Sequence, residues 1–291
     1  MKYALFLGCT VPVRTMAYEI STRNVMKKLG ISLVDLEDFG CCGFPLESID
    51  HDTYLSVAAR NLAVAEAANL QVMTMCSACN GSLLKANLAM QDKNTRDEIN
   101  ANLKPINRQY RGTTVVKHAA RVLYETMDTI KEMATPLNLK VAAHYGCHYT
   151  KPSEIYEDFE DPEVPYSLEE LISAVGATPV PYENKKQCCG GSVMGIDESV
   201  SLEMVREKLS HIKKAGADAM VLICPFCDVM YDINQKRIEN QTGEQFGIPV
   251  LFLPQLIGLA LGLTPDELGL KMNRVSVRNL LKTLGDDNEQ K

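Results

Sequence analysis

The amino-acid sequence predicts an α/β protein made of two tandem halves related by a pseudo-twofold axis, each with a mainly parallel sheet flanked by helices. Three observations support this prediction. The ten cysteines fall into two sets of five in the same order. Apolar strand-like runs alternate with helical patterns in both halves. Finally, 291 residues suffice for two domains of about 150 residues each.

The cysteine repeat is the strongest internal signal. Each set has a single cysteine, a Cys-Cys-Gly some thirty to forty residues later, and a Cys-x-x-Cys after a further interval of similar length. Ten independently placed cysteines would almost never show this register twice, so the chain contains an internal duplication. The two sets are Cys9, Cys41, Cys42, Cys76 and Cys79, and then Cys147, Cys188, Cys189, Cys224 and Cys227.

The first half begins with an apolar run, YALFLGC at 3–9, that predicts a buried strand ending in Gly-Cys. The elements expected after it are a helix at 54–70, a strand ending in Cys-x-x-Cys at 72–79, a helix at 80–91, a surface helix and loop at 90–112, and a closing segment at 113–125.

The second half repeats this order. The expected elements are a strand ending in Gly-Cys at 141–147, a helix at 200–216, a strand ending in Cys-x-x-Cys at 220–227, a helix at 228–241, and a closing segment at 248–260. The alternation of strand and helix implies parallel strands. A boundary near 128–139 predicts a first domain of residues 1–135 and a second of residues 136–291.

The composition argues against several classes of function. A net charge of −7 and a low aromatic content without Trp predict no nucleic-acid partner. The apolar run in the first ten residues is too short for a leader, and no run approaches the roughly 18–20 apolar residues of a membrane span. We therefore expect a cytoplasmic protein without a direct membrane span. In the cytoplasm, cysteines stay reduced.

The residues alone leave more than one use for the thiols. A Cys-x-x-Cys that opens a helix favours thiolates, which either attack a disulfide or bind a metal. A thioredoxin-like pair would not require the other three cysteines of each set. A zinc site takes four ligands and leaves one thiol of each five unused. Five thiols from three separate strand ends fit an iron–sulfur cluster more open than a four-cysteine cubane.

The Cys-Cys-Gly motif suits such a cluster. Adjacent side chains leave the backbone in different directions, so Cys41 and Cys42 can reach different irons. We expect Gly43 and Gly190 to be cofactor-binding positions, because glycine tolerates positive φ and lets the backbone come close to the cluster.

The duplicated pattern resembles the paired cysteine-rich (CCG) domains of the B-type subunit of heterodisulfide reductase from methanogens, over nearly the whole chain. The resemblance implies two noncubane [4Fe-4S] clusters, with the disulfide of coenzyme M and coenzyme B cleaved between them. It thus implies the catalytic subunit of a soluble CoB-CoM heterodisulfide reductase in methanogenesis. The cluster ligands would be Cys9, Cys41, Cys42, Cys76 and Cys79 for one site, and Cys147, Cys188, Cys189, Cys224 and Cys227 for the other.

The resemblance also implies protein partners. These are a C-type iron–sulfur subunit as the electron donor, a flavin-containing A-type subunit, and a hydrogenase or formate dehydrogenase in a larger complex. The chain has no Gly-x-Gly-x-x-Gly and no P-loop, so its electrons are expected from outside. The alternative is a related CCG-domain iron–sulfur subunit that transfers electrons in a dehydrogenase or a quinone-linked reductase.

Several charged residues lie near the cysteines in the sequence. Arg14, Lys185 and Lys186 are candidates to bind the acidic groups of the substrate, although a solvated surface role is the more common use of such residues. His144 and His148 are candidate proton donors to the departing thiolates, with a packing role as the alternative.

Overall fold

Two four-stranded sheets form the frame of the protein, one in each half of the computed structural model, which describes residues 1–156 and 159–285. Their strand orders are β2-β1-β3-β4 and β6-β5-β7-β8, and all of these neighbours are parallel. The predicted pair of α/β halves is therefore confirmed. The strands are β1 (Lys2–Phe6), β2 (Ser32–Val34), β3 (Gln71–Thr74), β4 (Val116–His118), β5 (Lys140–His144), β6 (Thr178–Pro179), β7 (Ala219–Leu222) and β8 (Val250–Phe252).

The central strands are apolar along their length because helices cover both faces of each sheet. In β1 and β5 every residue after the first is buried, and β7 is buried throughout. Phe6 pairs with Thr74 and His144 with Leu222, so the carboxyl ends of the two central strands lie level in each half. The Gly-Cys and Cys-x-x-Cys motifs follow directly after these four ends, which places them along one edge of each sheet.

Two helices of the first half lie where the apolar periodicity places them, whereas α2 is not among the expected elements. The predicted helices at 54–70 and 80–91 correspond to α3 and α4, and the surface segment at 90–112 contains α5 and a 3₁₀ turn. The bounds are α1 (Val11–Arg14), α2 (Met16–Lys28), η1 (Phe44–Leu46), α3 (His51–Ala67), α4 (Ser77–Ala89), α5 (Lys93–Leu103), η2 (Lys104–Ile106), α6 (Ala119–Glu125) and α7 (Met127–Met133).

The second half has a similar set of helices. Helix α9 is not among the expected elements, and one predicted helix departs from the prediction. Its elements are α8 (Cys147–Thr150), η3 (Ser153–Ile155), α9 (Ser167–Ala174), α10 (Glu198–Lys214), α11 (Pro225–Asp228), η4 (Val229–Ile233), α12 (Gln235–Thr242), α13 (Leu253–Ala260), η5 (Leu270–Met272) and α14 (Arg278–Thr283).

The departure is the segment 228–241, which the periodicity predicts as one helix. It is interrupted by the π-helical turn η4. The Asn234 side chain donates to the Val229 carbonyl at 2.8 Å, and the Asp232 carboxylate accepts the backbone N–H groups of Arg274 and Val275 at 2.6 and 2.8 Å. These side-chain bonds hold the wider turn in place, as is typical of π-bulges.

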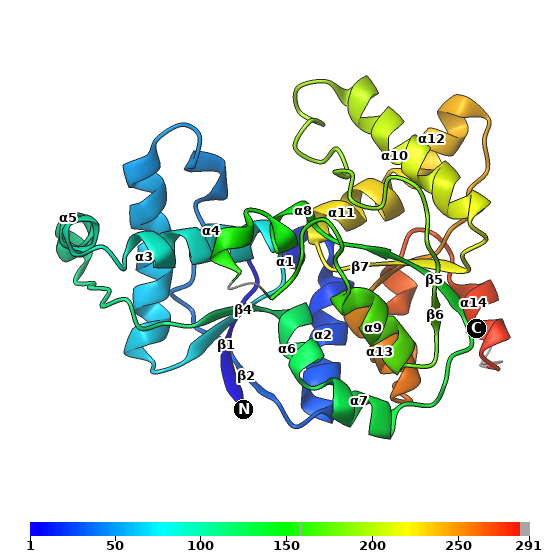
Figure 1. The fold of residues 1–291 in the computed structure, drawn as a ribbon, viewed down its shortest axis with the longest axis horizontal. Coiled ribbons are helices and arrows are strands. Elements are labelled where there is room, and N and C mark those ends of the chain that lie inside the picture. Colours follow the sequence, from blue (N-terminus) through cyan, green and yellow to red (C-terminus); the bar gives the residue numbers. More distant parts are fainter. Residues whose placement is uncertain (157–158, 286–291) are drawn as a thin grey trace.

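The two halves pack against each other through their helices. Helix α2 of the first half contacts α13 of the second, and α4 contacts α8. The Tyr18 ring stacks on Phe252 with centroids 4.1 Å apart, and its hydroxyl donates to the Ile223 carbonyl at 3.1 Å. Figure 1 shows α8 and α11 near the middle of the molecule, between α3 and α4 on one side and α10 and α12 on the other. The domain division at 135/136 stays a prediction.

Candidate functional site

The ten cysteines are all free thiols, and the fold brings them to the carboxyl ends of the central strands. Cys9, Cys41 and Cys147 are exposed and Cys188 is half-buried. Solvent or another molecule can therefore reach the outer end of each set. The other six are buried, namely Cys42, Cys76, Cys79, Cys189, Cys224 and Cys227.

In the first half the thiols form a row. Cys41 lies near Cys9 and interacts with Cys42, the Cys42 thiol interacts with that of Cys79, and Cys79 interacts with Cys76. Contact with Cys79 lowers the pKa of Cys42 to about 7, whereas contacts with Cys42 and Cys76, together with burial, raise the pKa of Cys79 well above its ordinary value. One thiolate in this row therefore makes the next one harder to form.

The second half repeats the row. Cys147 interacts with Cys188, Cys188 with Cys189, Cys189 with Cys227, and Cys227 with Cys224. Contacts with Cys147 and Cys189 lower the pKa of Cys188 to about 2. Contact with Cys188 raises the pKa of Cys189 to about 12, and contact with Cys189 raises that of Cys227. The pKa values of Cys147, Cys189 and Cys227 are thus raised and those of Cys188 and Cys224 lowered, because an anion at one thiol disfavours a second anion beside it.

The two rows meet between the Cys-x-x-Cys motifs. The Cys76 thiol interacts with that of Cys224, so the ten thiols form one continuous row across both halves. Gly146 makes this junction tight, because a Cβ there would lie 2.3 Å from Ser77 Oγ and 3.2 Å from Cys224 Cβ. Sequence reasoning did not find this junction, which is formed only by the packing of the halves.

The donor set fits a group with several metal atoms. Metal ligands must be thiolates, yet an anion at one thiol disfavours a second anion beside it, so five thiolates in each half require added positive charge. Within residues 1–156 and 159–285, no three His, Cys, Asp or Glu side chains surround one point as ligands of a single metal ion do. A row of thiols therefore matches an iron–sulfur group, whose irons each take different ligands, better than one four-coordinate zinc ion.

The glycines of the Cys-Cys-Gly motifs have the expected backbone conformation. Gly43 has φ +86° and Gly190 has φ +79°. Their N–H groups point at the sulfurs of Cys41 and Cys188, each at 3.4 Å. A Cβ at Gly190 would lie 3.0 Å from the Ser201 carbonyl oxygen, so only glycine fits there without a shift.

Residues outside the motifs support the cysteine loops, the segments that carry Cys41–Cys42 and Cys188–Cys189. Ser82 Oγ donates to the Cys42 carbonyl at 2.7 Å, and Asn61 Nδ2 donates to the Cys41 carbonyl at 2.8 Å. A Cβ at Gly8 would lie 2.9 Å from the sulfur of Cys79. The sequence indicates that this position matters, because Gly8 and Gly146 each directly precede the first cysteine of a set.

The basic side chains suggested for substrate binding are mostly engaged elsewhere. Lys185 is paired with Glu169 at 2.5 Å, and Lys186 with Glu163 at 2.5 Å. Arg14 is exposed on α1. Two of the three suggested anion-binding residues are thus neutralised by carboxylates.

The two candidate proton donors lie in different surroundings. His144 is fully buried at the end of β5 with its Nε2 unpartnered, and burial lowers its pKa well below the ordinary value. His148 packs edge-on against Phe44 of the other half, at 4.9 Å between ring centroids, and burial followed by the charge of Lys85 lowers its pKa. Both imidazoles therefore favour the neutral form, which weighs against donation from an imidazolium.

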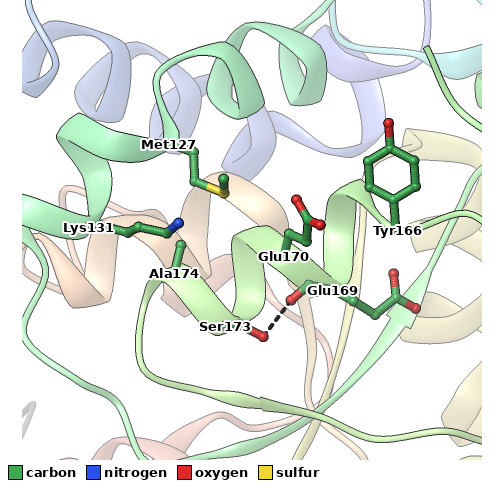
Figure 2. A pocket seen from close by; sticks show the side chains of 7 residues that line it. All are labelled: Met127, Lys131, Tyr166, Glu169, Glu170, Ser173 and Ala174. Carbon is green, nitrogen blue, oxygen red and sulfur yellow. Dashed lines mark hydrogen bonds between the residues drawn. The ribbon is translucent and has the colours of Figure 1, made fainter.

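A surface hollow elsewhere does not coincide with the thiols. It lies between α7 and α9 and contains none of the ten cysteines (Figure 2). On its rim the Ser173 hydroxyl donates to the Glu169 carbonyl at 2.8 Å.

Within the described ranges, every helix is too short or too polar to cross a membrane.

Comparison with known proteins gives a consistent result. The profile of a family described as "CCG: Cysteine-rich domain" matches residues 3–84 and 141–232. The chain is 40% identical, over 94% of both chains, to the B-type subunit of the ferredoxin/F(420)H(2)-dependent CoB-CoM heterodisulfide reductase of Methanosarcina acetivorans. It is 35% identical, over 96% of this chain and 99% of the other, to the 8-methylmenaquinol:fumarate reductase membrane anchor subunit of Wolinella succinogenes.

A solved structure shares the fold. A hypothetical protein from Helicobacter pylori superposes with a TM-score of 0.80 over 95% of this chain and 52% of that chain, at 17% sequence identity. At this identity the likeness concerns the arrangement of the elements alone.

Proposed function

The chain belongs to the family of CCG cysteine-rich domain proteins, and from that premise we propose that it is the catalytic subunit of a heterodisulfide reductase. Its substrate is the disulfide of coenzyme M and coenzyme B, which it reduces to the two thiols. The observation that carries the proposal is the continuous row of thiols, in which two complete sets of five meet through Cys76 and Cys224. An electron carrier needs one such set, and the reduction of one disulfide by one-electron donors is better served by two.

Each set of five thiols holds one noncubane [4Fe-4S] cluster in this proposal. The first site uses Cys9, Cys41, Cys42, Cys76 and Cys79, and the second uses Cys147, Cys188, Cys189, Cys224 and Cys227. When bound, the clusters supply electrons singly. The reaction takes up two electrons and two protons, breaks one S–S bond and forms two S–H bonds.

The protein's own residues position this chemistry. The glycines at 43 and 190 direct N–H groups at cysteine sulfurs, which favours their thiolate form. Exposed Cys9, Cys41 and Cys147 leave the outer end of each set open to a substrate. The electrons come from a separate iron–sulfur protein of the same complex, with a flavin protein and a hydrogenase or formate dehydrogenase beyond it. The cytoplasm is the compartment that this assembly implies.

One comparison favours a second candidate function. The relative from Wolinella succinogenes is named for a menaquinol:fumarate reductase, and it aligns over 96% of this chain. The alternative is therefore an iron–sulfur subunit that passes electrons between a quinone-linked partner and another acceptor, without reducing a disulfide.

The test begins with the anaerobically purified chain. We expect iron and acid-labile sulfide at about eight each per chain, as two four-iron clusters require, and reduction of the coenzyme M–coenzyme B disulfide when the donor subunit is added. Zinc without sulfide would contradict the proposal. Two full clusters with no disulfide reduction would favour the quinone-linked alternative.

Two variants test the need for both sites. Cys42→Ser and Cys189→Ser should each abolish disulfide reduction while keeping the spectroscopic signal of the other cluster. Ser48→Ala, which alters an exposed hydroxyl in the first cysteine loop, is the matched control and should keep full turnover. Full turnover by either cysteine variant would sink the two-site mechanism.

A further inference from the structure

The two halves differ at one buried position behind the cysteine loops. Helices α3 and α10 have the same length and begin after an aspartate that caps them, with Asp50 accepting from Thr53 N at 3.0 Å and Asp197 from Val200 N at 3.1 Å. The Cys-Cys-Gly motif precedes each aspartate by the same number of residues, so the two helices can be aligned without gaps. In this alignment Asn61 of α3 corresponds to Lys208 of α10.

Asn61 supports the first cysteine loop with a neutral amide. It is 1% exposed, its Nδ2 donates to the carbonyls of Cys41 and Val57 at 2.8 and 3.0 Å, and its Oδ1 accepts from Gly40 N at 2.9 Å. Its Oδ1 also accepts from Arg60 Nη1 at 3.4 Å. Asn61 itself is neutral, and the Arg60 side chain that bonds to it is partly exposed to solvent.

Lys208 occupies the same place behind the second loop with an ammonium group. It is fully buried, and its Nζ donates to the carbonyls of Gln187 and Lys185 at 2.6 and 3.0 Å and lies 3.5 Å from His144 Nδ1. Gln187 directly precedes Cys188, as Gly40 precedes Cys41. Lys208 thus also bonds to the backbone beside the vicinal cysteines, at the carbonyl of the residue before them, but with a positively charged group.

That charge has no carboxylate partner of its own. The hydrogen-bonding partners of Nζ within the described residues are carbonyl oxygens and a ring nitrogen. Burial lowers the pKa of Lys208 to about 8, and the nearby sulfurs of Cys227, Cys189, Cys188 and Cys147 oppose this change. A buried, unpaired ammonium is costly unless negative charge lies nearby, and the thiolates of the second site are the groups that supply it.

We propose that the two cluster sites are electronically inequivalent, because Lys208 places a positive charge beside the second site where the first has the neutral Asn61. This inference rests on the proposed function, since it requires a cluster in each site. A positive charge favours the state with one more electron, so the second cluster has the higher reduction potential and holds the first electron that an external one-electron donor delivers. Lys208 acts through the cluster and is a positioning residue, not a catalytic one.

The test is a mediated reductive titration with dithionite, followed by cluster spectroscopy, on the full chain with its clusters. The wild-type chain should show two midpoint potentials. Cys189→Ser, which keeps the first site, should titrate at the lower potential, and Cys42→Ser, which keeps the second, at the higher. Coincident potentials in the wild-type chain, or the reverse assignment in these variants, would overturn the inference without any change at Lys208.

Variants of the lysine then isolate its charge. Lys208→Met should lower only the higher potential, by at least a tenfold change in the equilibrium constant for one-electron reduction, which is about 59 mV. Lys208→Arg should keep the wild-type value. Lys214→Met removes the same charge from an exposed position on α10 and is the matched control, with no shift expected because solvent screens it.

The outcomes separate this inference from the proposed function. If iron and sulfide are absent, the cluster sites themselves fail and the inference falls with them. If both clusters are present and Lys208→Met leaves the higher potential unchanged, or shifts both potentials equally, the inference alone is overturned. If Lys208→Met loses the second cluster, the titrations of the wild-type chain, Cys42→Ser and Cys189→Ser still test the inference. It is overturned if the two potentials coincide or if the second site has the lower one.

Discussion

Replacing Gly146 by alanine tests whether the junction between the two cysteine sets matters. Gly146 has φ −67° and ψ 133°, a conformation that alanine adopts freely. The effect of the substitution therefore comes from contacts alone. A Cβ at this position would lie 2.3 Å from Ser77 Oγ, 2.8 Å from Ser77 Cβ and 3.2 Å from Cys224 Cβ.

The size of the effect follows from these distances. The Ser77 hydroxyl can rotate away, but its Cβ is fixed to the first turn of α4, so the start of this helix and the adjacent Cys76 must move. Inserting a methyl group into a packed site costs about 1–3 kcal/mol. For a chain of this size each kcal/mol lowers the melting temperature by about 2–4 °C, so we expect a decrease of about 2–12 °C.

The assay is anaerobic thermal unfolding of the cluster-loaded chain, with iron content measured on the same samples. Gly195→Ala is the control, because a Cβ there meets nothing within 4 Å. Adding Ser77→Gly removes both crowded atoms, so the double variant should be less destabilised than the sum of its two single changes. Two results would refute the crowding argument. One is an equal melting temperature for Gly146→Ala and Gly195→Ala, and the other is a double variant whose loss of stability equals the sum of the two single changes.

Three further predictions concern other contacts of the fold. Gly43→Ala should melt lower than Gly30→Ala and lose iron from the first site, because both have positive φ but only at Gly43 would a Cβ lie 3.1 Å from a carbonyl oxygen; equal melting and iron content would contradict this. Tyr18→Phe removes the 3.1 Å bond to the Ile223 carbonyl but keeps the stacked ring, so thermal unfolding should show a loss of about 1 kcal/mol, and an unchanged stability would argue against a link there. Burial raises the pKa of Asp232 to about 6, so its contribution to the free energy of unfolding is fully present below about pH 4 and falls by about 3 kcal/mol as pH rises through 6. Asp232→Asn should flatten this dependence, and parallel pH profiles for the two proteins would show that the carboxyl is not responsible.

The duplicated fold could be predicted because the sequence carries the same information twice. Gly-Cys after an apolar run and Cys-x-x-Cys after another mark the carboxyl ends of β1, β3, β5 and β7, and the helices between them show clear periodicity. The edge strands β2 and β6 gave no comparable signal, because they are short and only partly buried. The break in the helix at 228–241 depends on residues 274 and 275, which lie far away in the sequence.

The candidate site was only partly predictable for a similar reason. The membership of the two cysteine sets follows from spacing, and so does the need for glycine after each vicinal pair. The contact between Cys76 and Cys224 does not, since it arises where two halves pack together and no local pattern encodes it. The pair Asn61 and Lys208 lies between these cases, because aligning the capping aspartates of the two helices finds it without any structure.

This pair also bears on why a duplicated site would lose its symmetry. An unsymmetrical disulfide presents two different sulfurs, and two identical sites would bind it equally well in either direction. The Asn61 amide and the Lys208 ammonium each donate to a backbone carbonyl next to or within the vicinal cysteine pair, so the two loops are held by donors of different charge. If the chain reduces such a disulfide, as proposed, the difference in charge between the two sites would give the departing thiolates unequal partners, because the sulfur with more negative charge is better stabilised beside the lysine. On the proposed function, duplication would supply the two sites and one buried side chain would give the reaction a direction.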